Sequence, residues 1–325
     1  MIVQTFDNGW GPEWPAKQVE LTVVDQVLST LAHDSSRTVI INSTWYTTEY
    51  HQQVLEWLRC NPVSHIVLVA MIDAAIPNPD WYSEFNCEII GLGYYPGPTE
   101  IDFWALVLNQ YHTPIDINIL TDANKIQHAY MCLNRKPHWH RKRLYQQLEN
   151  LNLLNSGLVS MGGIRTLPGD STQDNLAPNA GIDQYGIGND LVSLGLLDNW
   201  TSSFLNIVTE TVFDINQNHF VSEKIYKPIV GCRPFLVYDP DGASCWLTSR
   251  GFKTFNNDFK DISNLDLTNP DNIALFLKEL CLQPKEYFQT KFIALKDKIM
   301  YNKLHFAEYI QSQQNIINKG TQCQV

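Results

Sequence analysis

The chain has 325 residues, of which 44% are hydrophobic and 18% are charged, and its formal net charge is -11. This length allows two domains of ordinary size. This negative charge argues against a general nucleic-acid binder, which would normally be basic, and against electrostatic docking on anionic membranes. We find no signal peptide in the sequence, and no stretch reaches the roughly 20 apolar residues of a membrane span. We therefore expect a cytoplasmic protein without a membrane span.

The first part of the chain alternates strand and helix signals. Ser64–Ala70 is a continuous apolar run, typical of a strand that is buried on both faces of a parallel sheet. Strands that alternate with helices predict such a sheet with helices on both sides. The expected strands are 2–6, 38–41, 64–70 and 87–92, and the expected helices are 17–31, 50–59 and 101–111.

A second series follows, and it predicts a second Rossmann-like domain of the α/β class. In such sheets ligands bind outside the carboxyl ends of the strands. The expected strands are 128–133, 157–161 and 204–209, and the expected helices are 137–152, with Pro137 at the first helical position, 243–250, 271–281 and 285–314. We place an N-terminal domain at 1–124, a second domain at 125–284 and a C-terminal helical segment at 285–325.

The stretch Asn218–Gly231 predicts a short helix that leads into the strand Phe235–Tyr238. Ser222 is a good N-cap, and Gly231 is expected to end the helix with a positive φ. Two residues break local rules: Lys224 lies in the first turn, where the helix dipole disfavours a cation, and Pro228 removes a backbone hydrogen bond. A helix start with a lysine predicts an anion site, and phosphate is the usual anion.

Metal binding has little support in the sequence. The seven cysteines are scattered without a C-x-x-C pair, which favours buried reduced thiols, and the histidines show no zinc-ligand spacing. Asp239-Pro240-Asp241 resembles a metal-binding D-x-D motif, but it equally describes a turn after a strand, which we favour. Lys253 is expected on an exposed strand.

Several charged residues are candidates for binding a nucleotide or a sugar. Arg135 follows a predicted strand and, with Arg141 as a second candidate, could meet phosphates; the alternative for this basic cluster is a solvated helix face or a nuclear-localisation-like patch. Glu210 could accept from sugar hydroxyls or cap a neighbouring helix. Glu223 and Lys224 are expected about 100° apart on their helix. They would then serve a hydroxyl and a diphosphate respectively, or form a surface pair.

Three segments together resemble the donor-site motif of α1,3-fucosyltransferase-type enzymes. Leu205–Thr211 matches a strand that ends in an acidic residue. Phe220–Tyr226 matches a helix of the pattern V-T-E-K-hydrophobic-aromatic, and Arg233–Val237 matches a strand after a proline. Ser222 replaces the usual threonine. Lys227-Pro228 stands where that family has Asn-Ala, and this version is more similar to uncharacterised relatives from phages and giant viruses.

The resemblance implies a GT-B fold, in which two Rossmann-like domains face each other across a cleft. It implies a donor site for a nucleotide-diphosphate sugar in the second domain and a carbohydrate or glycoconjugate acceptor against the first. Glu223 would bind the ribose and Lys224 the diphosphate, and such enzymes usually need no metal. Ser222, Tyr226 and Glu210 are grouped with this site, and Arg135 joins it by position. The alternative role of Tyr226 is packing, and Lys227 is expected on the surface.

The resulting hypothesis is a cytoplasmic glycosyltransferase with an inverting mechanism, for which a virus- or phage-encoded origin is one option. Inversion needs a base from the N-terminal domain; Asp73, which follows a buried strand, is the first candidate, and Asp7 and Glu100 are alternatives. A non-catalytic nucleotide- or carbohydrate-binding protein on the same scaffold is the competing hypothesis. Glucosylation of phage DNA is a third, which the basic cluster permits and the net charge disfavours.

Overall fold

The computed structural model describes residues 2–6, 25, 28, 37–42, 48–61, 65–72, 84–93, 100–111, 115–134, 136–167, 194–210, 213, 221–239 and 243–319. Contacts divide the chain into two compact units. The first consists of Met1–Gln110 with Tyr309–Val325, and the second of Tyr111–Glu308. The division falls before the boundary expected after residue 124, and the end of the last helix belongs to the first unit.

The first unit contains a parallel five-stranded sheet whose strands follow the order of the chain. Ile40 and Ile66 of the sheet pack with Val54 and Leu58 of helix α2 in a buried cluster. The expected helix 17–31 lies outside the described residues except for Asp25 and Leu28. The elements are β1 (Ile2–Phe6), β2 (Arg37–Asn42), α2 (Thr48–Cys60), β3 (His65–Ile72), β4 (Cys87–Gly93), β5 (Glu100–Ile101) and α3 (Phe103–Tyr111).

Helix α3 begins later than expected. Asp102 stands before it, and the Oδ1 atom of Asp102 accepts from the amide of Ala105 at 3.0 Å, so Asp102 caps the helix. Glu100 and Ile101, which the sequence placed in or next to this helix, form the short strand β5 instead.

The second unit contains a parallel four-stranded sheet, and its three expected strands before β9 are confirmed within one residue at each end. All pairings in it are parallel. The elements are α4 (Ile117–Leu120), the 3-10 turn η2 (Ala123–Lys125), β6 (His128–Asn134), α5 (Trp139–Asn150), β7 (Gly157–Met161), α6 (Leu197–Ser202), β8 (Ser203–Val208), α7 (Glu223–Val230), β9 (Phe235–Val237), α8 (Ala243–Ser249), α9 (Pro270–Cys281) and α10 (Lys285–Lys319).

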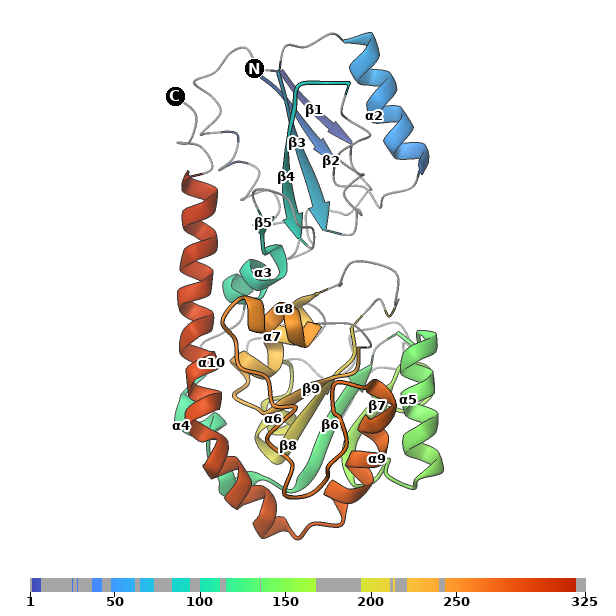
Figure 1. Ribbon diagram of the computed structural model, residues 1–325, viewed down its shortest axis with the longest axis vertical. Coiled ribbons are helices and arrows are strands. Elements are labelled where there is room, and N and C mark those ends of the chain that lie inside the picture. The colour runs from blue at the N-terminus through green and yellow to red at the C-terminus, as the bar shows by residue number, and fades with distance from the viewer. Residues whose placement is uncertain are drawn as a thin grey trace. The chain divides into compact units, whose positions relative to one another are not determined.

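The strand order of this sheet, β7-β6-β8-β9, reverses direction between β6 and β8. Helices α5 and α9 lie on one side of the sheet, and α6 and α7 lie on the other (Figure 1). The arrangement is a mixed α/β one, compatible with a Rossmann-like unit. In such sheets the crevice outside the carboxyl ends of the strands at the reversal point is where ligands bind.

Helix α7 confirms the predicted N-cap at Ser222 and the predicted end at Gly231, but not the expected positive φ of Gly231. The Ser222 side chain accepts from the amide of Lys224, as expected of an N-cap, and Pro228 lies inside the helix. Gly231, however, has φ -80, and the positive φ of 52 occurs at Cys232. Gly231 is needed for space: a Cβ there would lie 2.5 Å from Cε3 of Trp200.

Helix α5 also begins later than predicted. Its first residue is Trp139 and its N-cap is His138, so Pro137 precedes the helix instead of occupying its first position. Lys253 is exposed but lies in no strand; its ammonium sits 3.8 Å from the centroid of the Tyr301 ring. In the described part of the chain no helix is long and apolar enough to cross a membrane.

The prediction of buried thiols is confirmed for only some of the cysteines whose burial the structure describes. Cys132 and Cys232 are buried free thiols, whereas Cys60 and Cys245 are exposed. Cys60 is the last residue of α2, and Cys245 lies in α8 between the buried residues Ala243 and Leu247.

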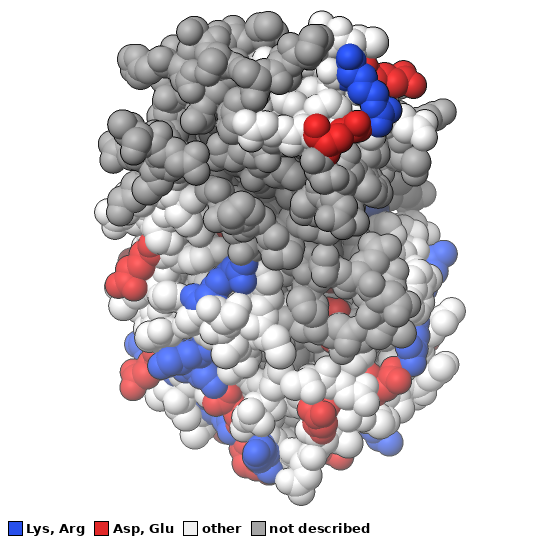
Figure 2. All heavy atoms as spheres, turned by 45° about the horizontal axis from the view of Figure 1, so that its top comes forward, with Lys and Arg blue, Asp and Glu red and all other residues white. Residues whose placement is uncertain are grey.

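Charges of both signs are mixed on the described surface. On the face drawn in Figure 2, Lys and Arg lie between Asp and Glu over the described residues. The surplus of acidic residues therefore forms no single large patch on the described part of that face.

Candidate functional site

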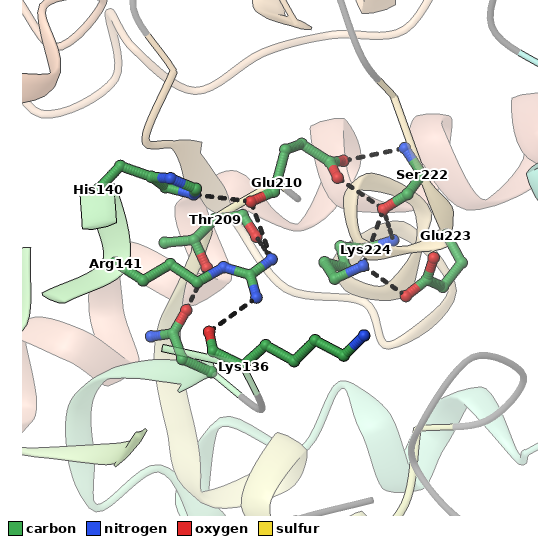
Figure 3. A network of polar contacts seen from close by, with 9 residues as sticks. Lys136, His140, Arg141, Thr209, Glu210, Ser222, Glu223 and Lys224 are labelled. Atoms are coloured by element: carbon green, nitrogen blue, oxygen red, sulfur yellow. Dashed lines mark hydrogen bonds and ion pairs between the residues drawn. The ribbon is translucent and has the colours of Figure 1, made fainter. Parts of the chain in front are cut away.

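The reversal point between β6 and β8 is occupied by polar side chains. Asn134 ends β6, and Thr209 and Glu210 follow β8 directly; all three are buried. The hydroxyl of Thr209 donates to Oδ1 of Asn134, which links the ends of the two strands. Helices α5 and α7, which follow β6 and β8 in the chain, begin close to this point (Figure 3). The strand ends and the two helix starts form the candidate site.

Glu210 joins the end of β8 to the start of α7. Its Oε2 accepts from the Ser222 hydroxyl at 2.6 Å, and its Oε1 accepts from the Ser222 amide at 3.1 Å. Burial raises the pKa of Glu210, while the charge of Lys224 and the bonds from Ser222 act in the opposite direction. Glu210 therefore has the capping role that the sequence left open as its second possibility.

Glu223 and Lys224 meet each other instead of diverging. The Nζ atom of Lys224 lies 2.9 Å from Oε1 of Glu223 and 3.1 Å from the Ser222 hydroxyl (Figure 3). The expected separation around the helix does not hold, because the long lysine side chain folds back over the first turn. The Lys224 side chain is 29% exposed and that of Glu223 only 1%, so this is no surface pair.

Glu223 also has an oxygen that no described residue satisfies. Its Oε2 is buried and has no hydrogen-bond partner within the described ranges. A buried acceptor without a donor costs about 1–3 kcal/mol. This carboxylate oxygen is therefore well placed to accept from a hydroxyl of a bound molecule.

His140 and Arg141 of α5 hold the backbone at the end of β8. The Nε2 atom of His140 lies 2.9 Å from the Glu210 carbonyl oxygen, and one terminal nitrogen of Arg141 donates to the carbonyls of Thr209 and Glu210 at 3.0 and 2.8 Å. The other donates to the carbonyl of Lys136 at 3.2 Å. Arg141 is 3% exposed, so its guanidinium serves the fold and not a solvent-borne phosphate.

Positive charge gathers around His138, the N-cap of α5. Burial lowers the pKa of His138, and the charges of Arg141, Lys136 and Lys224 lower it further. The buried Nε2 of His138 has no hydrogen-bond partner among the described residues. Lys136 is exposed, and its side chain extends from the turn after β6 in the direction of α7 (Figure 3). Helix α5 has no capping side-chain bond and no acidic residue in its first turn.

The structure places the other predicted residues as follows. Arg135, Asp73 and Asp7 lie outside the described residues, and of Glu100 only the backbone, in β5, is described. Tyr226 is fully buried against the rings of Trp246, Phe252 and Phe306, which is the packing role.

Two further predictions near the site are resolved by the structure. Lys227, expected on the surface, is buried with 8% exposure. Helix α7 is buried on nearly all sides, since Glu223 and every residue from Ile225 to Val230 are buried, so the position of Lys227 does not face solvent. Asp239 of the D-x-D motif accepts at Oδ2 from the amide of Ala243, the first residue of α8, at 3.0 Å, whereas Pro240 and Asp241 lie outside the described residues.

The sequence analysis did not single out Lys136, His138 or Trp139. Lys136 and His138 belong to the basic cluster, where composition alone does not distinguish them from their neighbours. A signal for Trp139 was present: it is a large aromatic residue among the charged and histidine residues 135–143, where burial is not expected.

We compared the chain with protein-family models, with curated proteins and with solved structures, and found no match in any of the three.

Proposed function

We propose that the carboxyl edge of the second unit's sheet binds a nucleotide-diphosphate sugar and that the protein is a GT-B glycosyltransferase. The observation that carries the proposal is the pair at the start of α7. Glu223 offers a buried carboxylate oxygen without a partner among the described residues, and Lys224 offers a partly exposed ammonium beside it. Ribose hydroxyls and a diphosphate are the groups that such a pair would bind.

Charge near the site supports the diphosphate part of the proposal. Lys136 and Lys224 both act on His138, so two lysines from different elements lie near the start of α5. Together with the first-turn amides of a helix that lacks acidic residues in that turn, they would favour a phosphate group. Arg135, next to Lys136 in the chain, remains a proposed diphosphate ligand.

The proposed reaction needs no metal, because these cations would stabilise the departing diphosphate. The bond between the anomeric carbon and the diphosphate oxygen breaks, and that oxygen leaves with the electron pair. An acceptor hydroxyl oxygen forms the new bond to the anomeric carbon and gives its proton to a base. Inversion follows when the attack comes from the opposite face, and we assign the base to Asp73, Glu100 or Asp7 of the first unit.

If Glu223 binds the ribose, the protein should prefer nucleotides that carry ribose hydroxyls over nucleotides that lack them. A thermal-shift screen with GDP, UDP, CDP and ADP first selects the base. Wild type should then bind this ribonucleoside diphosphate about tenfold or more tightly than its 2′,3′-dideoxy form, because a hydrogen bond to a charged group contributes about 1.5–3 kcal/mol. Glu223→Gln should lose most of this preference, since its amide nitrogen cannot accept.

The exposed Glu286, at the start of α10, provides the matched control as Glu286→Gln, which should keep the wild-type preference. Equal affinities of the ribo and dideoxy forms for wild type would refute the role of Glu223. Release of free sugar from the matching nucleotide sugar would separate an enzyme from a protein that only binds it.

A further inference from the structure

Trp139 is an exposed aromatic residue at the edge of the candidate site. It is the first residue of α5, and 60% of it is exposed. Its neighbours in the chain are His138, which lies in the field of Lys224, and His140, which contacts the Glu210 carbonyl. An exposed indole beside a polar site can offer its flat face to a planar ligand.

A column of stacked rings fixes the surroundings of Trp139. His138 stacks on His140 at 5.9 Å between centroids, His140 on Phe213 at 5.0 Å, and Phe213 on Tyr238 at 5.3 Å. The column runs from the start of α5 to the end of β9. The two inner rings, His140 and Phe213, are therefore covered on both faces, so another aromatic ring can contact them only at their edges.

Trp139 meets this column at right angles. Its ring lies 5.7 Å from His140 at 83° and 5.2 Å from Phe213 at 89°. These two contacts hold the indole on the column without burying it. An aromatic residue held in one orientation before binding loses little conformational entropy when a flat ligand stacks on it.

We propose that Trp139 is the surface on which the nucleobase of the donor stacks; this inference rests on the proposed function. In a nucleoside diphosphate, the ribose separates the base from the diphosphate. The surface that stacks on the base must therefore lie near the lysines that bind the diphosphate, but separated from them by the ribose. Trp139 meets this condition, because it adjoins His138, on which Lys136 and Lys224 act, and carries no charge itself. Stacking on an indole suits every base, so base selection would belong to other residues.

Calorimetric titrations of Trp139→Ala and Trp139→Phe, with the best-binding nucleoside diphosphate and with inorganic pyrophosphate, test this assignment. Stacking on an aromatic side chain contributes about 1–3 kcal/mol per base, so Trp139→Ala should bind the nucleotide about 5-fold to 150-fold more weakly. Trp139→Phe should lose less, and pyrophosphate affinity should not change. Tyr301→Ala, which alters an exposed aromatic residue of α10, is the control and should match wild type.

Wild-type nucleotide affinity in Trp139→Ala would overturn the stacking role and leave the proposed function standing. Equal losses for the nucleotide and pyrophosphate would also overturn it, because the effect would then lie at the phosphates. Failure of wild type to bind any of the four nucleoside diphosphates would overturn the proposed function and this inference with it.

Discussion

His140 connects helix α5 to the end of strand β8. It is 1% exposed, and because the Glu210 carbonyl can only accept, Nε2 of His140 carries the proton in this bond. Burial lowers the pKa of His140 to about 4, with smaller effects of Arg141 and His138 in the same direction and of the Glu210 bond in the other. The imidazole is therefore neutral in the folded protein near neutral pH.

This shift predicts a loss of stability in acid. An unfolded histidine binds its proton near pH 6.5, whereas folded His140 binds it only near pH 4. Between these values the unfolded chain holds more protons, so the free energy of unfolding falls as the pH is lowered from about 6.5 to about 4. We expect His140 to account for about 1–3 kcal/mol of this fall, allowing for some solvent screening.

Denaturant unfolding of wild type and His140→Gln, at pH values across this range, measures the contribution. The difference between the two proteins isolates His140, because the other titrating groups are shared. The advantage of wild type at neutral pH should shrink steadily toward pH 4. A difference that stays constant with pH would contradict the assignment of a buried neutral imidazole.

At this scale, the sequence predicts roles that depend on near neighbours. The Ser222 cap follows from its hydroxyl and the next two residues. The bond between Ser222 and Glu210 spans 12 residues and exists only because β8 and α7 bring the two together, so the sequence left the role of Glu210 open. The burial of Lys227 and the inward turn of Arg141 likewise depend on packing between elements.

At the scale of elements, regular patterns predicted most of the described helices and strands. Two errors fall at helix starts: Asp102 caps α3, and α5 begins at Trp139, so both helices start after the expected residues. The short elements α4, α6 and β5 were not predicted, because none of them is long enough to show a hydrophobic period. The reversal of strand order between β6 and β8, which positions the candidate site, could not be derived from hydrophobic periodicity, because periodicity does not specify which strands pair.

The turn after α7 provides a prediction at this scale. A Cβ on Gly231 would lie 2.5 Å from Cε3 and 2.9 Å from Cζ3 of Trp200, although its φ of -80 suits any residue. Gly231→Ala should therefore lower the free energy of unfolding by about 1–3 kcal/mol through overpacking. Chemical denaturation of purified protein measures this loss.

A second substitution tests the cause of that loss. Trp200→Phe removes the two ring atoms that the new methyl group would meet, and also the indole bond to the Leu194 carbonyl. In a double-mutant cycle, Gly231→Ala should cost clearly less in the Trp200→Phe background. An equal cost in both backgrounds would show that the methyl group does not clash with Trp200.

At the scale of the whole molecule, the two units differ in what they offer a ligand. The described strands of the first unit follow chain order, so the reversal point occurs in the sheet of the second. The proposed base, Asp73, Glu100 or Asp7, belongs to the first unit, so the two units would have different roles in the proposed reaction.

The negative net charge of the chain means that a bound diphosphate must be held by cations close to the site. The chain carries -11, so a diphosphate is not attracted by the molecule as a whole. At physiological ionic strength charges beyond about 8 Å are largely screened, and the nearby cations decide. Lys224 should therefore dominate nucleotide affinity, while a lysine elsewhere on the surface should have little effect.

Calorimetric titration of Lys224→Ala with the preferred nucleoside diphosphate tests the central claim most directly. Lys278→Ala, an exposed lysine of α9, is the charge-matched control. We expect Lys224→Ala to bind at least about tenfold more weakly than wild type, a loss of about 1.4 kcal/mol or more, and Lys278→Ala to bind as wild type does. Wild-type affinity in Lys224→Ala would contradict the claim.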